Sequence, residues 1–221
     1  MKLEGKKINF LGDSITQAHA LENIEDSYWN VLKKECGLAE ARGYGLGGTR
    51  IARQSEQGKK WGMERWHLDF CQRFTEMDDD ADVVVVFGGT NDYGHGDAPM
   101  GNMSDRQPDT FYGACHYLFE GLINKYPHAE IVVMTPLHRA NEENDISEMG
   151  IAKNVYLCDY VEVIKEVAEY YSLPVLDLWS VSGIQPNIEI NRQTFAPDGL
   201  HPNVAGHRRI ASRLEGFLKS L

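Results

Sequence analysis

The stretch ADVVVVFGG, residues 81–89, places four consecutive valines and a phenylalanine directly before a pair of glycines. β-branched side chains favour an extended backbone, and an uninterrupted apolar run is typical of a strand that is covered on both faces. The stretch therefore predicts a central strand over residues 83–87. The acidic run before it, residues 77–82, is interpreted as a solvated turn, because it lacks the ligand pattern of a calcium-binding loop.

Further short apolar runs alternate with longer segments of helical period on either side of this strand. This alternation predicts βαβ units, a mostly parallel sheet and an α/β fold in one domain over residues 1–221. The other expected strands are residues 8–11, 41–44, 131–135 and 175–178. The expected helices are residues 27–34, 61–77, 110–125, 152–171 and 204–218.

The charge balance excludes some classes of partner. The chain of 221 residues has 22 Lys and Arg against 33 Asp and Glu, which gives a net charge of −11 at pH 7. Negative charge repels phosphate backbones and anionic bilayers, so neither nucleic acid nor a membrane is an expected partner. No apolar stretch approaches the length of a membrane span, and MKLEGKKINF at the start lacks a signal-type apolar block. We therefore expect a cytoplasmic protein, whose oligomeric state is left open.

The cysteines indicate no metal or redox chemistry. They are far apart and include no Cys-x-x-Cys pair, which disfavours a zinc cage or a redox motif. None lies in a Gly-rich turn of the kind that would present a nucleophile, so free and mostly buried thiols are expected. The chain is therefore expected to use no metal and no cofactor. The four residues are Cys36, Cys71, Cys115 and Cys158.

Two long segments without a clear strand or helix pattern follow expected strands directly, at residues 88–108 and 136–150. Connections of this length are uncommon in a compact domain unless they bind something or are disordered. Ligands of an open parallel sheet bind beyond the carboxyl ends of its strands. The two segments therefore start where a binding site is expected.

A serine follows the first expected strand in the stretch FLGDSITQ, residues 10–17. Gly12 permits a sharp turn, and a helix is expected just after Ser14, so that the Ser14 hydroxyl and N–H would share the positive end of that helix. Gly-Asp-Ser is also typical of an ordinary turn. The tripeptide alone leaves open whether Ser14 is a nucleophile or a turn residue.

Possible hydrogen-bond donors follow the next two strands. The stretch GYGLGGTRIA, residues 43–52, is either a flexible turn or a source of glycine N–H groups for an oxyanion. Asn91, in Gly-Thr-Asn-Asp, either bonds its own backbone or adds a neutral side-chain donor.

A histidine with a carboxylate nearby precedes the last expected helix, in FAPDGLHPN, residues 195–203. A lone loop histidine is usually a surface residue. An aspartate on the same loop can bond the ring Nδ1–H and leave Nε2 free to take a proton from a serine, so Asp198 and His201 suit Ser14. Because three of the four motifs follow successive parallel strands, all four are expected to meet at one rim, and this convergence favours a nucleophilic serine.

With these motifs in place, the chain resembles the SGNH hydrolases, also called GDSL esterases or lipases. The resemblance implies a flavodoxin-like, three-layer α/β/α sandwich with a mostly parallel five-stranded sheet. The second motif departs from the family pattern, because Tyr44 or Gly45 stands where an Asn often precedes the glycines. The four matching blocks are Gly12-Asp13-Ser14, Gly48 within GLGGTR, Gly89-Thr90-Asn91-Asp92 and Asp198-Gly199-Leu200-His201.

The resemblance also implies the role of each site residue. Ser14 would be the nucleophile and one oxyanion donor, and Gly48 and Asn91 the other donors. His201 would be the general base and Asp198 its orienting partner. The reaction would be transfer of an acyl group to water through a serine ester.

The substrate is inferred from the long segments. Their polar and aromatic side chains suit a short-chain, acetyl-type ester of a carbohydrate-like or other small alcohol better than a long acyl chain. The expected substrate-binding residues are Asp13, Tyr93, His95, His138 and Arg139. For His95, His138 and Arg139 a hydrogen-bond network within the loops is the alternative.

Other functions stay open at this point. A lipase, lysophospholipase or thioesterase would use the same fold and the same serine. A non-catalytic, flavodoxin-like domain that binds a ligand, a nucleotide or a phosphate is a further alternative. The Gly-rich turn lacks the Lys-Ser/Thr of a P-loop and does not match G-x-G-x-x-G, which disfavours a nucleotide.

Overall fold

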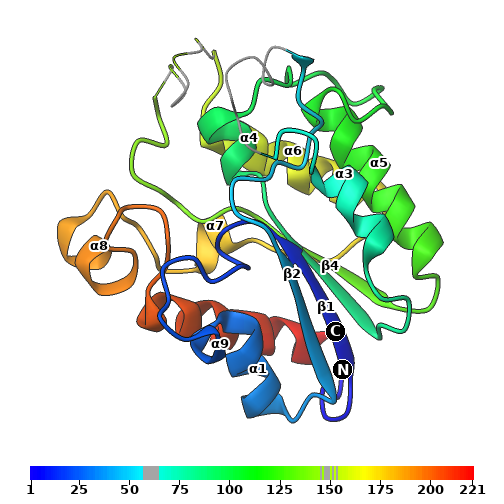
Figure 1. The fold of residues 1–221 in the computed structure, drawn as a ribbon, viewed down its shortest axis with the longest axis vertical. Helices are drawn as coiled ribbons and strands as arrows, with labels where there is room; N and C mark the ends of the chain where they lie inside the picture. Colours follow the sequence, from blue (N-terminus) through cyan, green and yellow to red (C-terminus); the bar gives the residue numbers. More distant parts are fainter. Residues whose placement is uncertain (57–64, 145, 147–149, 151, 153) are drawn as a thin grey trace.

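The computed structural model describes residues 1–56, 65–144, 146, 150, 152 and 154–221. Within these residues, five strands form one sheet in the order β2-β1-β3-β4-β5, and every pairing is parallel (Figure 1). The expected α/β fold is therefore confirmed. The strands are β1 (Lys7–Gly12), β2 (Glu40–Gly45), β3 (Val83–Phe87), β4 (Glu130–Met134) and β5 (Val175–Leu176).

The valine run forms the centre of the sheet, as predicted. Every residue of β3 is buried. Val85 pairs with Phe10 of β1 on one side and with Val132 of β4 on the other. Successive side chains point to opposite faces, so Val84 and Val85 belong to different hydrophobic clusters. The sheet is thus covered on both sides.

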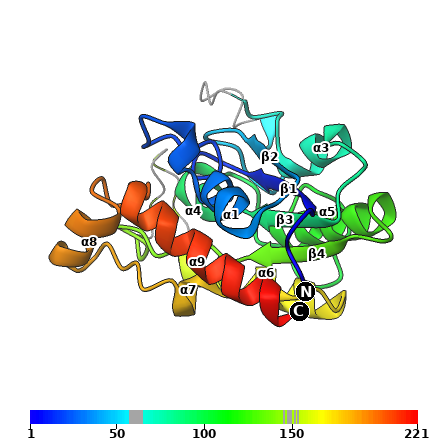
Figure 2. The ribbon, with the colours of Figure 1, turned by 90° about the horizontal axis from the view of Figure 1, so that it is seen from below.

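Helices form the outer two layers of the sandwich (Figures 1 and 2). The first cover, on the side of Val85, consists of α1 (Tyr28–Cys36) and α9 (Val204–Ser220). The second cover, on the side of Val84, consists of α3 (Phe70–Arg73), α5 (Phe111–Lys125) and α6 (Leu157–Tyr170). The three-layer α/β/α arrangement follows from this pattern.

Across the described ranges, no helix combines the length and the apolar content that a bilayer crossing requires.

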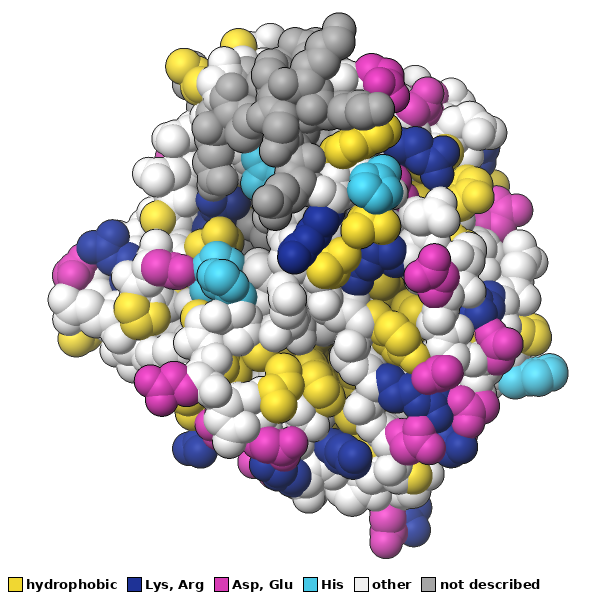
Figure 3. All heavy atoms as spheres, viewed as in Figure 1, with side chains coloured by type: hydrophobic (Ala, Val, Ile, Leu, Met, Phe, Trp, Pro, Cys, Tyr) yellow, Lys and Arg dark blue, Asp and Glu magenta, His cyan; other side chains and the backbone are white. Residues whose placement is uncertain are grey.

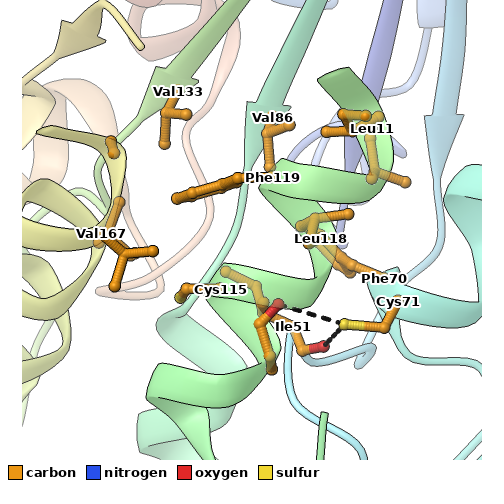
Figure 4. Packing of buried hydrophobic residues seen from close by; sticks show 14 of the residues in the cluster. Leu11, Ile51, Phe70, Cys71, Val86, Cys115, Leu118, Phe119, Val133 and Val167 are labelled. Carbon is orange, nitrogen blue, oxygen red and sulfur yellow. Dashed lines mark hydrogen bonds between the residues drawn. The ribbon is translucent and has the colours of Figure 1, made fainter. Parts of the chain in front are cut away.

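The contact between α5 and the sheet is made by large apolar side chains. Leu118 and Phe119 of α5 lie near Val86 and Val133 of the sheet (Figure 4). All four side chains are buried. Full burial of such a side chain contributes about 1.5–3 kcal/mol. This packing fixes the position of β3 and of the residues that follow it.

Two expected helices begin later in the chain than predicted. For the helix expected over residues 61–77, residues 61–64 lie outside the described part, and α3 begins only at Phe70. It is followed by a short 3-10 helix, Phe74–Glu76. The Asp69 carboxylate caps α3 by accepting the Gln72 N–H at 2.8 Å. The helix expected over residues 152–171 begins at Leu157. Capping contacts decide where a helix starts, and apolar spacing does not reveal them.

The last expected strand is shorter than predicted. It ends at Leu176 and not at residue 178. Asp177 instead caps a short helix, α7 (Leu178–Val181), by accepting the Ser180 N–H. A side chain that caps a helix cannot continue the strand, and this explains the difference.

The segment 88–108 was expected to be a loop, but it begins with a helix, α4 (Thr90–His95). Gly89 has a φ of 107°, a left-handed conformation that glycine adopts readily, and it turns the chain from β3 into α4. The helix is too short for an apolar period to indicate it. A second short helix that the sequence did not indicate is α8 (Glu189–Phe195).

A buried histidine ties the last helix to the first. His207 of α9 is 1% exposed. Its Nδ1 accepts the backbone N–H of Tyr28 at 3.2 Å, and the two rings stack with centroids 6.0 Å apart. Because burial disfavours the charged ring, the pKa of His207 falls from 6.5 to about 4. The contact therefore requires a neutral imidazole.

Acid should destabilise the protein through His207. Its pKa is lower in the folded than in the unfolded chain, so its stabilising contribution is complete above pH 6.5 and is lost as the pH falls toward 4. His207→Gln cannot ionise. Relative to this variant, the wild type should lose up to about 3 kcal/mol of unfolding free energy on acidification through that range. Urea titrations over this range measure the difference, and a difference that does not change with pH would contradict the prediction.

Candidate active site

The four motifs meet at the carboxyl edge of the sheet. Ser14 follows β1, Gly48 follows β2, Asn91 lies in α4, and His201 lies in the loop before α9. They share an open cleft of about 430 Å³. Within the described chain, no group of His, Cys, Asp and Glu side chains could hold a metal ion. The cleft is lined by Ser14, Gln17, His19, Gly47, Gly48, Arg65, Asn91, His95, Leu200 and His201.

Ser14, His201 and Asp198 form a continuous chain of hydrogen bonds. Ser14 Oγ lies 2.9 Å from His201 Nε2, and His201 Nδ1 lies 2.7 Å from Asp198 Oδ2. Although burial acts against it, hydrogen bonds from the Leu200 N–H and from His201 hold the pKa of Asp198 below its usual value. An ionised Asp198 keeps a proton on Nδ1 and leaves Nε2 to accept from the serine hydroxyl.

The turn that carries Ser14 leaves no room for side chains at two positions. A Cβ built on Gly12 would lie 1.9 Å from Thr16 Oγ1, and one built on Gly45 would lie 2.1 Å from Gln17 N. The chain after β1 therefore packs directly against the end of β2. This close approach sets the position of Ser14.

The segment after Ser14 is not the helix that the sequence predicted. Residues 14–20 fold as successive turns, and Ala18 has a left-handed φ of 64°. The positive end of a regular helix is therefore not available at Ser14. Individual N–H groups must supply the donors in the cleft.

The structure distinguishes the two glycines of the second motif. The Gly47 N–H donates to Gln17 Oε1 at 2.7 Å. The N–H groups of Gly48 and Ser14 find no acceptor among the described residues, and both residues border the cleft. Gly48 has a φ of 75°, a left-handed conformation that suits glycine. Gly48 is thus the glycine whose N–H is available to a ligand.

The Asn91 amide is oriented by its neighbours. An arginine nitrogen can only donate, so the 3.4 Å contact of Arg50 Nη1 with His95 Nδ1 makes Nδ1 the acceptor and places the ring proton on Nε2. His95 Nε2 then donates to Asn91 Oδ1 at 3.1 Å. The Asn91 NH₂ donates one hydrogen to Thr49 O at 3.0 Å and keeps a second donor at the cleft. Asn91 and His95 are four residues apart on α4, a spacing at which side chains meet.

Asp92 joins the second motif to the third. Its two carboxylate oxygens accept the N–H groups of Ile51 and Ala52, each at 2.9 Å. Asp92 is 3% exposed, so both bonds lie away from solvent. The loop that carries Gly48 is thereby fixed against α4. Asp92 belongs to the third motif, but its sequence position alone indicated no role for it.

Two of the expected substrate-binding residues lie away from the cleft. Asp13 is 2% exposed, its Oδ1 accepts the Ile15 N–H at 2.9 Å, and burial raises its pKa to about 7. Tyr93 is 4% exposed, and its hydroxyl donates to Asn141 O. Both side chains stabilise the loops around the site and neither lines the cleft, so their contact with substrate stays a prediction.

His138 and Arg139 are likewise held by partners in the loops. His138 Nδ1 lies 3.0 Å from the Glu142 carboxylate, and its ring lies 3.7 Å from that of Trp179. The Arg139 guanidinium is buried and donates to Thr90 O at 3.3 Å. Neither residue lines the cleft. The alternative of a loop network fits both residues, and among the expected set only His95 reaches the cleft.

Three polar residues of the cleft were not expected from the sequence. Gln17 and His19 follow Ser14 closely, and the His19 ring lies 4.8 Å from that of His201. Their nearness to Ser14 in sequence was a usable signal. Arg65, which donates to Gly47 O at 2.9 Å, belongs to none of the motifs, so the sequence held no signal for it.

A parallel α/β sandwich with a Ser-His-Asp chain at its carboxyl edge is an arrangement known from hydrolases. The chain belongs to the GDSL-like lipase/acylhydrolase family, whose model matches residues 10–209. The match spans all four motifs, so the resemblance to SGNH hydrolases is confirmed, and the protein is a hydrolase by family. No curated protein matched the sequence.

Solved structures share the fold over nearly the whole chain. One is 30% identical, with a TM-score of 0.84, over 100% of this chain and 99% of its own. A protein from Lactobacillus plantarum is 29% identical over 98% of each chain, with a TM-score of 0.82. A possible lipase from Chitinophaga pinensis is 21% identical over 97% of this chain and 98% of its own, with a TM-score of 0.66, a likeness that shows the fold alone.

The contact between His95 and Asn91 should affect turnover more than substrate binding. Asn91→Ala removes the oxyanion donor that the family resemblance implies, and should lower kcat by about 10²–10³-fold. His95→Ala keeps the Asn91 amide but removes the contact that orients it. We therefore expect a smaller loss in kcat, of about 10-fold, with little change in KM. His95→Gln can supply an N–H near the place of Nε2 and should recover much of the rate.

A double variant tests whether His95 acts through Asn91. In the Asn91→Ala background, His95→Ala should cause little further loss, because the group that it orients is gone. Steady-state kinetics on a small activated ester measure kcat and KM of the wild type, the two alanine variants and the double variant. Independent losses that multiply in the double variant would contradict the prediction.

Proposed function

We propose that the protein is a serine esterase that hydrolyses carboxylic esters through an acyl-enzyme on Ser14. The observation that carries the proposal is the chain of hydrogen bonds from Ser14 through His201 to Asp198. Ser14 Oγ lies 2.9 Å from His201 Nε2, and His201 Nδ1 lies 2.7 Å from Asp198 Oδ2. Donors from Ser14, Gly48 and Asn91 border the same cleft. Nucleophile, base and oxyanion donors are the parts that acyl transfer requires.

The proposed reaction has two similar halves. His201 Nε2 takes the hydroxyl proton as Ser14 Oγ attacks the ester carbonyl, and the oxyanion is stabilised by the N–H groups of Ser14 and Gly48 and by the Asn91 amide. The imidazolium then protonates the leaving alcohol, and the acyl group stays on Ser14. His201 takes a proton from water as the water attacks this ester, and returns it to Ser14 Oγ as the carboxylic acid leaves. Asp198 stabilises the imidazolium in both halves.

The proposed substrate is a short-chain ester, of acetyl type, on a carbohydrate-like or other small alcohol. The cleft supports this class, because its described lining is polar or glycine apart from Leu200, and a long acyl chain needs an apolar channel. An esterase active on acetylated mannans has the same fold, at 20% identity over 99% of this chain and 50% of its own, with a TM-score of 0.61. At that identity, the likeness concerns the fold.

Ser14→Ala should abolish ester hydrolysis and leave the fold intact. Loss of a serine nucleophile should reduce kcat by about 10⁴-fold or more, with the melting temperature almost unchanged. Hydrolysis of 4-nitrophenyl acetate and a thermal melt measure the two quantities. Ser104→Ala removes a hydroxyl from an exposed loop and serves as the matched control, with full activity expected. Activity retained in Ser14→Ala would refute the nucleophile.

Chain-length preference tests the substrate class separately. In a series of 4-nitrophenyl esters from acetate to octanoate, kcat/KM should fall as the chain lengthens, because Leu200 is the one hydrophobic side chain in the described lining of the cleft. Release of acetate from acetylated sugars should be detectable beside it. A preference for the octanoate would favour a lipase, and a strong preference for the matching thioesters would favour a thioesterase, with the serine mechanism unaffected.

A further inference from the structure

We propose that the cleft selects esters that carry a carboxylate or a similar compact anion close to the scissile bond, and that Arg65 recognises this charge. The inference rests on the proposed esterase function and narrows its substrate class. The Arg65 side chain lies close to the nucleophile. A Cβ built on Gly47 would lie 3.5 Å from Ser14 Cβ and 3.7 Å from Arg65 Nη1, so the nucleophile and the guanidinium border the same space.

Within the described residues, the Arg65 side chain donates one hydrogen bond. Its Nη1 donates to Gly47 O at 2.9 Å. It makes no ion pair with an Asp or Glu in the part of the chain that the structure describes, whereas Arg42 contacts Asp80 at 2.7 Å. A guanidinium carries several N–H donors in a planar fork that suits a carboxylate. Its donors beyond the one to Gly47 O have no acceptor among the described residues.

Among the described residues, no acidic side chain balances the charge of Arg65 at the cleft. Its described lining contains no Asp or Glu, although the chain has a net charge of −11. Two arginines beneath the cleft, Arg50 and Arg73, have carboxylates nearby, those of Asp92 and Asp13 respectively. On the face shown in Figure 3, Lys, Arg and His side chains occur near the middle and most acidic side chains lie toward the edges. An anion would complete the charge balance at Arg65.

The backbone of Arg65 is held in an uncommon conformation. Its φ of 59° is left-handed, which residues with a Cβ rarely adopt. The Leu68 N–H donates to Arg65 O at 3.0 Å, and Arg50 Nη2 lies 3.5 Å from the same oxygen. Neighbouring groups thus maintain a strained turn that directs this side chain to the cleft. Such outliers concentrate at ligand sites.

A purely structural role of Arg65 would affect the rates of ester hydrolysis differently. Because Gly47 O and the Gly48 N–H belong to the same peptide, Arg65 also orients the proposed oxyanion donor. That effect would act on every ester alike. Charge recognition acts only on esters with an anion, so the ratio of rates for a charged and a neutral ester of similar size separates the two roles.

The first experiment compares 4-nitrophenyl hemisuccinate with 4-nitrophenyl butyrate. Wild type should favour the hemisuccinate in kcat/KM, and Arg65→Gln should lower the ratio of the two rates by about 10–100-fold, as expected for loss of a charged hydrogen bond. Arg65→Lys should keep part of the ratio. Arg213→Gln removes a charge from an exposed position of α9 and should leave the ratio unchanged. An equal ratio in wild type and Arg65→Gln means that Arg65 does not recognise a charge on the acyl side.

A second pair of substrates places the charge on the alcohol. Here 2-acetoxybenzoate is compared with the neutral 2-acetoxybenzamide, in the same four proteins and with the Ser14→Ala background subtracted. A ratio that depends on Arg65 in one pair only identifies the side that carries the anion. A ratio independent of Arg65 in both pairs would overturn the proposal.

The outcomes also separate this proposal from the esterase function. If no ester is hydrolysed above the Ser14→Ala background, the esterase function fails. Charge recognition is then decided by calorimetric titration of monomethyl succinate into wild type and Arg65→Gln. Binding that is lost in the variant supports recognition by Arg65, and binding that is equal or absent in both overturns it.

Discussion

The register of three parallel strands is the constraint on which the site depends. Gly12 pairs with Gly45 on one side and with Phe87 on the other, so β1, β2 and β3 end at the same level of the sheet. The loops that follow start from one edge, and Ser14 and Asn91 meet there. A Cβ at Gly12 or Gly45 would collide with the turn that carries Ser14. The pairing of these strands therefore also sets the position of the serine.

Buried polar groups beneath this edge orient the groups that face the cleft. Asp92 holds the backbone of the second motif, and His95, in contact with Arg50, turns the Asn91 amide. Donors held in this way need no reorganisation when charge develops on a substrate. The arrangement has a cost, since Arg50 Nε is buried with no partner among the described residues. A hydrogen-bond network of this kind connects residues that are far apart in sequence.

Net charge and local charge differ in this protein. The chain carries −11, yet the described lining of the cleft contains Arg65 and no acidic side chain. The overall charge bears on nonspecific contacts with polyanions, which it disfavours. The local charge bears on small molecules that reach the serine, where distances are short and solvent screening is weaker.

The sequence by itself determined the α/β class, the central strand over residues 83–87 and the four motifs, because β-branching, apolar period and Gly-rich turns are properties of neighbouring residues. It did not reveal α4, the late start of α6 or the early end of β5, since caps and packing decide these. Nor did it separate His95 from Asp13, Tyr93, His138 and Arg139, or find Arg65. Only the tertiary structure decided which polar side chains reach the cleft, because burial and hydrogen bonding depend on partners that are distant along the chain.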